Sequence, residues 1–151
     1  DAIVKDVEQN GKYDYCICTH TLEDISSPAY VSRQINKIAK SGIISFPSKY
    51  RECSRFEMGP GGYRGYNHHR WIMTIKDGCV LAFPKVNLIE YSFFDNIAKY
   101  SREDRYELFA IWEDSFEFKI INSDWLGPSP KECMEMYMKE LSNTDEDKRV
   151  V

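Results

Sequence analysis

Residues 13–47 contain two short apolar runs separated by a helical pattern, and this arrangement constrains the fold more than any other feature of the sequence. The first run, at 13–19, is almost continuously apolar, which is typical of a strand buried on both faces. Pro28, preceded by a serine, is a favourable first residue for a helix over 28–41. A second apolar strand is predicted at 43–47. Together these elements predict a βαβ unit with a right-handed crossover.

The rest of the chain predicts mixed structure. The Asp77-Gly78 step between two apolar runs is a strong signal for an antiparallel hairpin. The Ser129-Pro130 step is a good helix start, and the apolar stripe that follows it is expected to face the core. The predicted segments are an extended piece at 1–6, loops at 7–12 and 48–67, the hairpin at 69–84, a helical stretch at 93–111 broken near Ser101, a strand at 116–121, a turn at 122–128 and a helix from Pro130, whose stripe is Cys133, Met134, Tyr137, Met138 and Leu141.

Composition limits the class of protein. A chain of 151 residues is the usual size of one domain, here expected over 1–142 with a charged tail at 143–151. No run approaches the ~18 apolar residues of a membrane span, and no signal peptide is visible, so we expect a cytoplasmic protein. The net charge of −4 argues against a nucleic-acid partner. An odd number of irregularly spaced cysteines predicts reduced thiols rather than a disulfide framework: Cys16, Cys18, Cys53, Cys79 and Cys133.

The run Tyr-Asp-Tyr-Cys-Ile-Cys-Thr-His-Thr-Leu-Glu-Asp-Ile, residues 13–25, resembles the fourth-strand motif of class I S-adenosylmethionine-dependent methyltransferases. In that family an aromatic-Asp pair opens a buried strand, and a short polar turn and a Leu-Glu-His step follow. Here the step ends in Asp24 instead of histidine. The predicted helix at 28–41 and strand at 43–47 match the next helix and the fifth strand of the family. The resemblance covers about residues 1–90.

The resemblance implies an α/β fold: a partial Rossmann-like methyltransferase sheet with an inserted antiparallel β-hairpin and C-terminal helices. It also implies S-adenosylmethionine as the cofactor. By position, Asp6 would contact the adenine ring, and Val7, Thr19 and His20 would line the rest of the cofactor site. The glycine-rich loop of the family is absent, so the chain looks like the C-terminal portion of an enzyme and is expected to bind the cofactor weakly or not at all on its own.

The adjacent histidines His68 and His69 are the sharpest candidates for catalysis, because a histidine can act as a general base near neutral pH. Structural or surface histidines are the alternative. Neighbouring residues of a strand point to opposite faces, so no metal site is expected from this pair. Tyr66 and Arg70 are predicted to bind the substrate. The arginines around the glycine-rich loop are expected either to hold an anionic substrate or to form a solvated loop of mixed charge: Arg51, Arg55, Arg64 and Arg70.

The reaction that the resemblance implies is methyl transfer to an unknown acceptor. A non-catalytic methyltransferase-like module that binds a partner protein is the second hypothesis. A nuclease built on the histidine-rich segment is a third, disfavoured because no full set of metal ligands can be assembled. A half-sheet leaves an open edge, and open edges pair with other chains. We therefore expect a homodimer through that edge.

Overall fold

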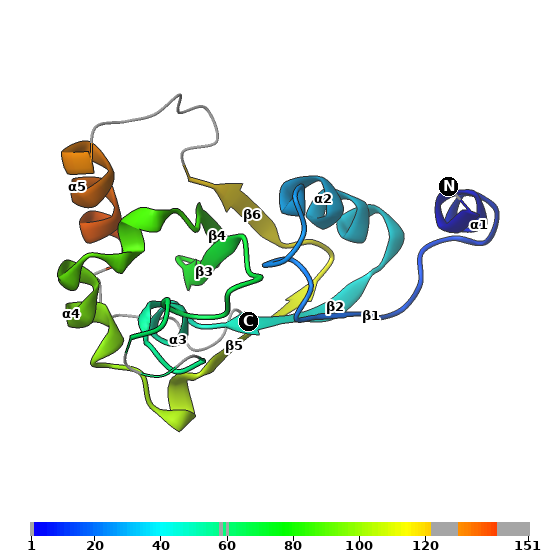
Figure 1. Ribbon diagram of the computed structural model, residues 1–151. Coiled ribbons are helices and arrows are strands. Elements are labelled where there is room, and N and C mark those ends of the chain that lie inside the picture. Colours follow the sequence, from blue (N-terminus) through cyan, green and yellow to red (C-terminus); the bar gives the residue numbers. More distant parts are fainter. Residues whose placement is uncertain (1, 58, 60, 122–129, 142–151) are drawn as a thin grey trace.

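The computed structural model describes residues 2–57, 59, 61–121 and 130–141, which form a mixed α/β protein with two small three-stranded sheets (Figure 1). No helix within these ranges is long and apolar enough to cross a membrane. In chain order, the helices and strands are α1 (Ala2–Asn10), β1 (Cys16–Thr19), α2 (Pro28–Ile38), β2 (Ser41–Pro47), α3 (Lys49–Cys53), β3 (Trp71–Lys76), β4 (Cys79–Pro84), α4 (Asp95–Ala98), β5 (Glu107–Glu113), β6 (Glu117–Ile120) and α5 (Pro130–Leu141), with short 3-10 helices at Asn87–Glu90, Ser92–Phe94 and Glu103–Arg105.

The first sheet contains the predicted βαβ unit. β1 and β2 are parallel neighbours, with Ile17 opposite Ile43, and α2 connects them. Pro28 opens α2, and Ile35 on its buried face packs in the core. β5 pairs antiparallel with β2, so the strand order is β1-β2-β5. The strand-helix-strand prediction is therefore confirmed, whereas the larger Rossmann-like sheet stays a prediction.

The second sheet contains the predicted hairpin. β3 and β4 are antiparallel, and the turn between them is formed by Asp77 and Gly78, which both have positive φ. Positive φ at both central residues is what a tight hairpin turn needs, and it explains the Asp-Gly step. β6 adds parallel to β4 and completes the order β3-β4-β6. The hairpin is thus confirmed, with β3 beginning at Trp71.

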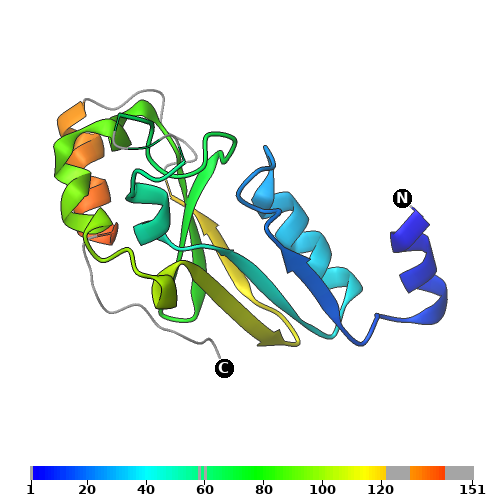
Figure 2. The same ribbon diagram turned by 60° about the horizontal axis from the view of Figure 1, so that its bottom comes forward.

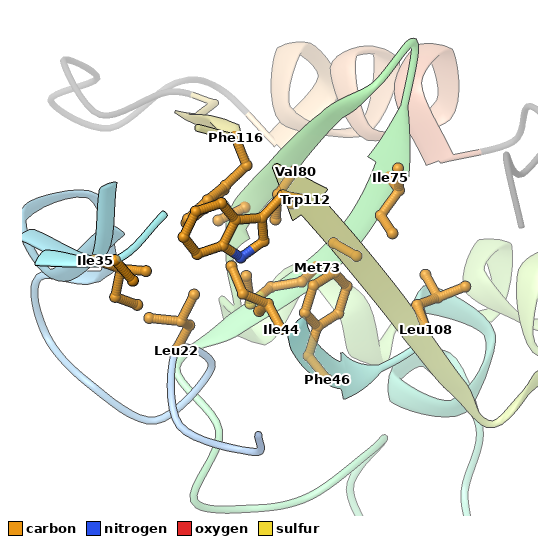
Figure 3. Close-up of a cluster of buried hydrophobic side chains, with 13 residues drawn as sticks. Leu22, Ile35, Ile44, Phe46, Met73, Ile75, Val80, Leu108, Trp112 and Phe116 are labelled. Atoms are coloured by element: carbon orange, nitrogen blue, oxygen red, sulfur yellow. The ribbon is translucent and has the colours of Figure 1, made fainter. Parts of the chain in front are cut away.

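The two sheets share the main hydrophobic core. Trp112 of β5 lies at its centre, among side chains from both sheets and from α2 (Figure 3). Successive residues of β4 alternate between this core and a second cluster, as the strand period of two requires. The labelled core residues are Leu22, Ile35, Ile44, Phe46, Met73, Ile75, Val80, Leu108, Trp112 and Phe116.

The second cluster lies on the other side of β3 and β4, under α3, α4 and α5. Figure 2 shows these helices gathered beside the hairpin, while α1 lies at the opposite end of the molecule. Tyr137 and Leu141 are buried in this cluster, so the apolar stripe of the last helix faces the core as predicted, although Met138 is largely exposed. The layers of the molecule therefore follow in the order first sheet, shared core, second sheet, second cluster and covering helices.

One face of the first sheet is open to solvent. The side chains of Ile17 and Ile111 are 71% and 51% exposed, and each lies opposite half-buried Ile43 in the register. Phe109 is exposed on the same face of β5. Cys16 and Cys18, the neighbours of Ile17, point the other way and pack against the core. β1 is therefore covered on one face only, which differs from the strand buried on both faces that its sequence predicts.

Three segments differ from the sequence-based expectation. The predicted loop at 48–67 contains the short helix α3 (Lys49–Cys53), which Ser48 caps. Residues 107–113 form β5 instead of the second half of a helix, and Leu108, Ala110 and Trp112 point into the core at the strand period of two. The N-terminal stretch forms α1 instead of an extended piece and a loop. The predicted turn at 122–128 with Trp125, the tail at 143–151 and the side chain of Cys133 lie outside the described parts of the chain.

Candidate functional site

Glu52, His69 and Lys85 form a buried ionic network. Ser48 caps α3 by accepting a hydrogen bond from the Arg51 backbone amide, and this short helix buries Glu52 at 1% exposure. Oε1 of Glu52 lies 2.7 Å from His69 Nδ1, and Oε2 lies 2.8 Å from Lys85 Nζ. Both carboxylate oxygens are thus matched by hydrogen-bond donors, which offsets the cost of burying the charge. The network fixes the position of the His69 ring.

The loop after β1 brings a second set of polar groups to the same place. His20 has a positive φ of 47°, and its amide donates to the Ser45 carbonyl at the end of β2. Its Nε2 lies 2.7 Å from Glu107 Oε1, and its Nδ1 lies 3.5 Å from Glu23 Oε1. Leu22 anchors the loop in the core. The loop is therefore ordered by contacts with both β2 and β5.

Glu23 is a buried carboxyl group at 1% exposure. Neither of its oxygens accepts a hydrogen bond from the described residues. Burial raises the pKa of this carboxyl group above its ordinary value, and the backbone amide of Glu23 itself and nearby His69 and His20 act in the opposite direction. A buried and unsatisfied carboxyl group is costly to stability and is typical of functional sites.

Backbone hydrogen bonds join this loop to the segment before β3. The Glu23 carbonyl accepts from the amides of Arg70 and Trp71, at 2.7 and 3.2 Å, and the Ile25 carbonyl accepts from the Trp71 indole at 2.8 Å. Asp24 lies between these two anchors and faces the histidine pair. These hydrogen bonds hold the side chains of the loop after β1 close to those of the segment before β3.

His68 and His69 both lie close to the carboxylate of Asp24. Their Nε2 atoms lie 3.9 and 3.6 Å from the same oxygen, Asp24 Oδ1, and their rings meet edge to face with centroids 4.5 Å apart. The expectation that the two side chains point to opposite faces of a strand is wrong, because β3 begins only at Trp71 and both histidines precede it. The two imidazole rings can therefore approach the same carboxylate oxygen, which adjacent residues of a strand could not do.

A pocket of about 530 Å³ opens beside His69, lined by Tyr63, Arg64, Asn67, His69, Lys85, Val86, Asn87, Ile89 and Glu90. Arg64 on its wall is buried, donates to the Cys53 carbonyl and pairs with Asp95 at 2.6 Å. Arg55 pairs with Glu90 at 2.7 Å. These two arginines neutralise carboxylates of the chain itself, which agrees with a loop of mixed charge more than with a clamp for an anion.

The four predicted cofactor residues lie in two places. Asp6 and Val7 are on α1, where Asp6 accepts hydrogen bonds from Tyr13 and from Asn10. Both hydrogen bonds lower the pKa of the Asp6 carboxyl group, and the one from Tyr13 has the larger effect. Thr19 and His20 lie at the carboxyl end of β1. Their roles in cofactor binding stay predictions, and for Asp6 the carboxylate is already engaged within the chain.

The predicted substrate residues differ in their surroundings. Tyr66 is half-buried, and its ring centroid lies 4.6 Å from that of His69 and 4.8 Å from that of Phe56. Arg51 lies over the same Phe56 ring, with its guanidinium carbon 3.3 Å from the centroid, an arrangement typical of a cation–π contact. Arg70 is exposed beside the histidines. Tyr66 and Arg70 thus border the site, and their binding roles stay predictions.

The sequence does not single out Glu52 or Lys85, and Glu52 is one charge among several in a polar segment. Glu23 and Asp24 are a carboxylate pair that the sequence predicts either as acid or base or as residues of a helical first turn. Lys85 follows the hairpin without any motif. A buried Glu52 became foreseeable only from its place in the capped helix after Ser48. Comparisons with protein-family models, curated proteins and solved structures find no match to this chain.

Proposed function

We propose that the chain takes part in methyl transfer from S-adenosylmethionine, as the C-terminal part of a class I methyltransferase. One observation supports the proposal above the others. His20, Glu23 and Asp24 follow β1, and Glu52 follows β2, so they gather at the carboxyl ends of the two parallel strands. In open α/β sheets this is the edge where ligands bind.

In this proposal the histidine pair prepares the acceptor. The His69 Nδ1 atom faces Glu52 at 2.7 Å, which places its proton on Nδ1 and leaves the lone pair on Nε2. The acceptor, held in the pocket beside His69, transfers its proton to Nε2. S-adenosylmethionine, when bound, would supply the methyl group: the electron pair freed on the acceptor would attack the methyl carbon in line, and the electrons of the sulfur–carbon bond would return to the sulfur. Orientation of the two reactants supplies most of the rate.

A titration of the ¹⁵N-labelled chain with S-adenosylhomocysteine, followed by NMR, tests cofactor binding. The amides of Thr19, His20 and Glu23 should shift, while those of the Asp77-Gly78 turn should not. We expect His20→Ala to weaken binding about tenfold, or about 1.4 kcal/mol, because it removes contacts at the carboxyl end of β1.

Asn96→Ala, a change at an exposed position of α4, is the matched control and should leave the titration unchanged. Absence of any shift up to millimolar ligand would contradict the proposal for this chain, as would shifts confined to the hairpin turn.

The open face of the first sheet favours a second candidate function, a non-catalytic module that binds another protein. The exposed side chains of Ile17, Phe109 and Ile111 form an apolar surface of the kind that marks protein interaction sites. Failure of the S-adenosylhomocysteine titration together with self-association of the chain would favour this candidate over methyl transfer.

A further inference from the structure

We propose that Asp24, His68 and His69 form a binding site for a divalent transition-metal ion of the zinc class. One potential ligand atom from each of these residues lies within 4.8 Å of the other two. The set offers a carboxylate oxygen and two imidazole nitrogens, which are ligands that Zn²⁺ accepts in proteins. The proposal goes beyond methyl transfer and does not depend on cofactor binding; a metal ion on Nε2 of His69 would occupy the lone pair that otherwise accepts the proton of the acceptor.

The distances suit a small metal ion with modest adjustment. Bonds of about 2.0–2.1 Å in a tetrahedral site place neighbouring ligand atoms about 3.3 Å apart. The Nε2 atoms of His69 and His68 lie 3.6 and 3.9 Å from Asp24 Oδ1. Asp24 Oδ1 is itself buried and accepts no hydrogen bond from the described residues, so a metal ion would supply its missing partner. The His68 side chain is exposed and is free to rotate the remaining distance.

Glu52 supplies the outer support that metal-bound histidines ordinarily have. A ligating histidine donates its second N–H to a carboxylate, which fixes the ring and keeps the other nitrogen available for the metal. The His69 Nδ1 atom makes this contact with Glu52, and Lys85 holds the far oxygen of the same carboxylate. His69 is only 8% exposed, so its orientation is set before any ion arrives.

The backbone frame around the ligands is also fixed. The bonds from Arg70 and Trp71 to the Glu23 carbonyl, and from the Trp71 indole to the Ile25 carbonyl, bracket Asp24 on both sides. Three protein ligands leave a coordination position open, as in catalytic zinc sites, where water or the nucleophilic atom of a substrate binds.

Isothermal titration of the untagged, metal-stripped chain with Zn²⁺ tests the site. We expect one ion per chain with a dissociation constant in the micromolar range or tighter. Asp24→Asn replaces the carboxylate ligand with a neutral amide and His68→Ala removes an imidazole ligand, and each change should weaken binding at least about 100-fold. Glu52→Gln should weaken it about 10- to 100-fold, the usual effect of losing an outer support. Co²⁺ should give visible d–d absorption in the wild type and lose it in the two ligand variants.

Two controls separate this site from other donors. His20→Ala removes the remaining histidine, which lies at Glu107 and outside the set, and should change Zn²⁺ affinity less than about threefold. Cys16→Ser tests the thiols of β1 in the same way. Circular dichroism before each titration establishes that every variant is folded.

Absence of Zn²⁺ binding up to millimolar concentration would overturn the proposal. So would binding that survives in both Asp24→Asn and His68→Ala but is lost in His20→Ala or Cys16→Ser. Because no methyl donor is present in these titrations, their outcome is independent of the S-adenosylhomocysteine experiment.

Discussion

At the scale of single residues, the thiol of Cys53 carries a testable consequence of burial. Cys53 is fully buried beside Glu52, and burial is the main cause that raises its pKa from 9.0 to about 12. A thiol whose pKa is higher in the folded chain than in the unfolded chain stabilises the fold. Its full contribution is present at pH values below the pKa of the unfolded chain. That contribution is lost as the pH rises between the unfolded and the folded values, because only the unfolded chain then releases its proton.

We predict that the free energy of unfolding falls by roughly 1 kcal/mol between pH 8 and pH 10 because of Cys53 alone. Urea unfolding of the wild type and of Cys53→Ala at both pH values measures this effect. The difference in the free energy of unfolding between the two proteins should be smaller at pH 10 than at pH 8. Between pH 6 and pH 8 the thiol stays protonated in both states, so the difference should be constant there. A difference that does not change up to pH 10 would refute the raised pKa.

At the scale of elements, the loop that follows α3 comes into close contact with that helix at Gly65. Its φ is +63°, and a Cβ built there would lie 2.3 Å from Glu52 Oε2 and 2.8 Å from Lys85 Nζ. We therefore predict that Gly65→Ala displaces the ionic network as well as straining the backbone. The free energy of unfolding should fall by about 3 kcal/mol, the sum of the left-handed strain and of overpacking.

Gly11→Ala provides the matched control, because Gly11 also has a positive φ but nothing lies near its Cβ position. That variant should lose only about 1 kcal/mol from backbone strain. In proton NMR, the His69 Nδ1–H resonance, which the hydrogen bond to Glu52 protects, should disappear in Gly65→Ala and persist in Gly11→Ala. Equal losses of stability in the two variants would show that the close contact with Glu52 does not matter.

The same scale shows why some elements could be predicted and others could not. Local composition and turn chemistry are enough to predict β1, α2, β2 and the Asp77-Gly78 hairpin. β5 does not, because Glu107, Leu108 and Ala110 are good helix formers, and its strand conformation depends on pairing with β2, far away in the sequence.

The candidate site was predictable only in part for a related reason. The adjacent histidines stand out in the sequence, but their partners Asp24 and Glu52 come from two other segments. What joins them is the backbone contact from Glu23 to Arg70 and the burial of α3, and neither leaves a sequence pattern. The sequence pattern does not predict the side-chain directions of His68 and His69, because the alternation of faces applies only within a strand and β3 begins at Trp71.

At the scale of the whole molecule, the first sheet ends in an unprotected strand. β1 pairs only with β2 within the described residues, and the uncovered face carries Ile17, Ile111 and Phe109. Exposed edge strands and apolar faces are avoided in stable monomers because they pair with other chains. A second copy of this chain offers the same strand and the same apolar row, and a two-fold arrangement would bury both at once.

We therefore predict that the purified chain forms a homodimer through β1, with a molar mass in light scattering that rises toward twice the monomer value with concentration. Ile17→Thr should shift this equilibrium toward monomer at least about tenfold, because the change removes exposed apolar area from the edge strand while keeping a residue that favours strands. Val86→Thr is the matched control: Val86 is 42% exposed, but it lies beyond the hairpin, remote from the first sheet in sequence and outside its strands. A chain that stays monomeric at every concentration would contradict the prediction, and equal weakening by both variants would place the contact elsewhere than β1.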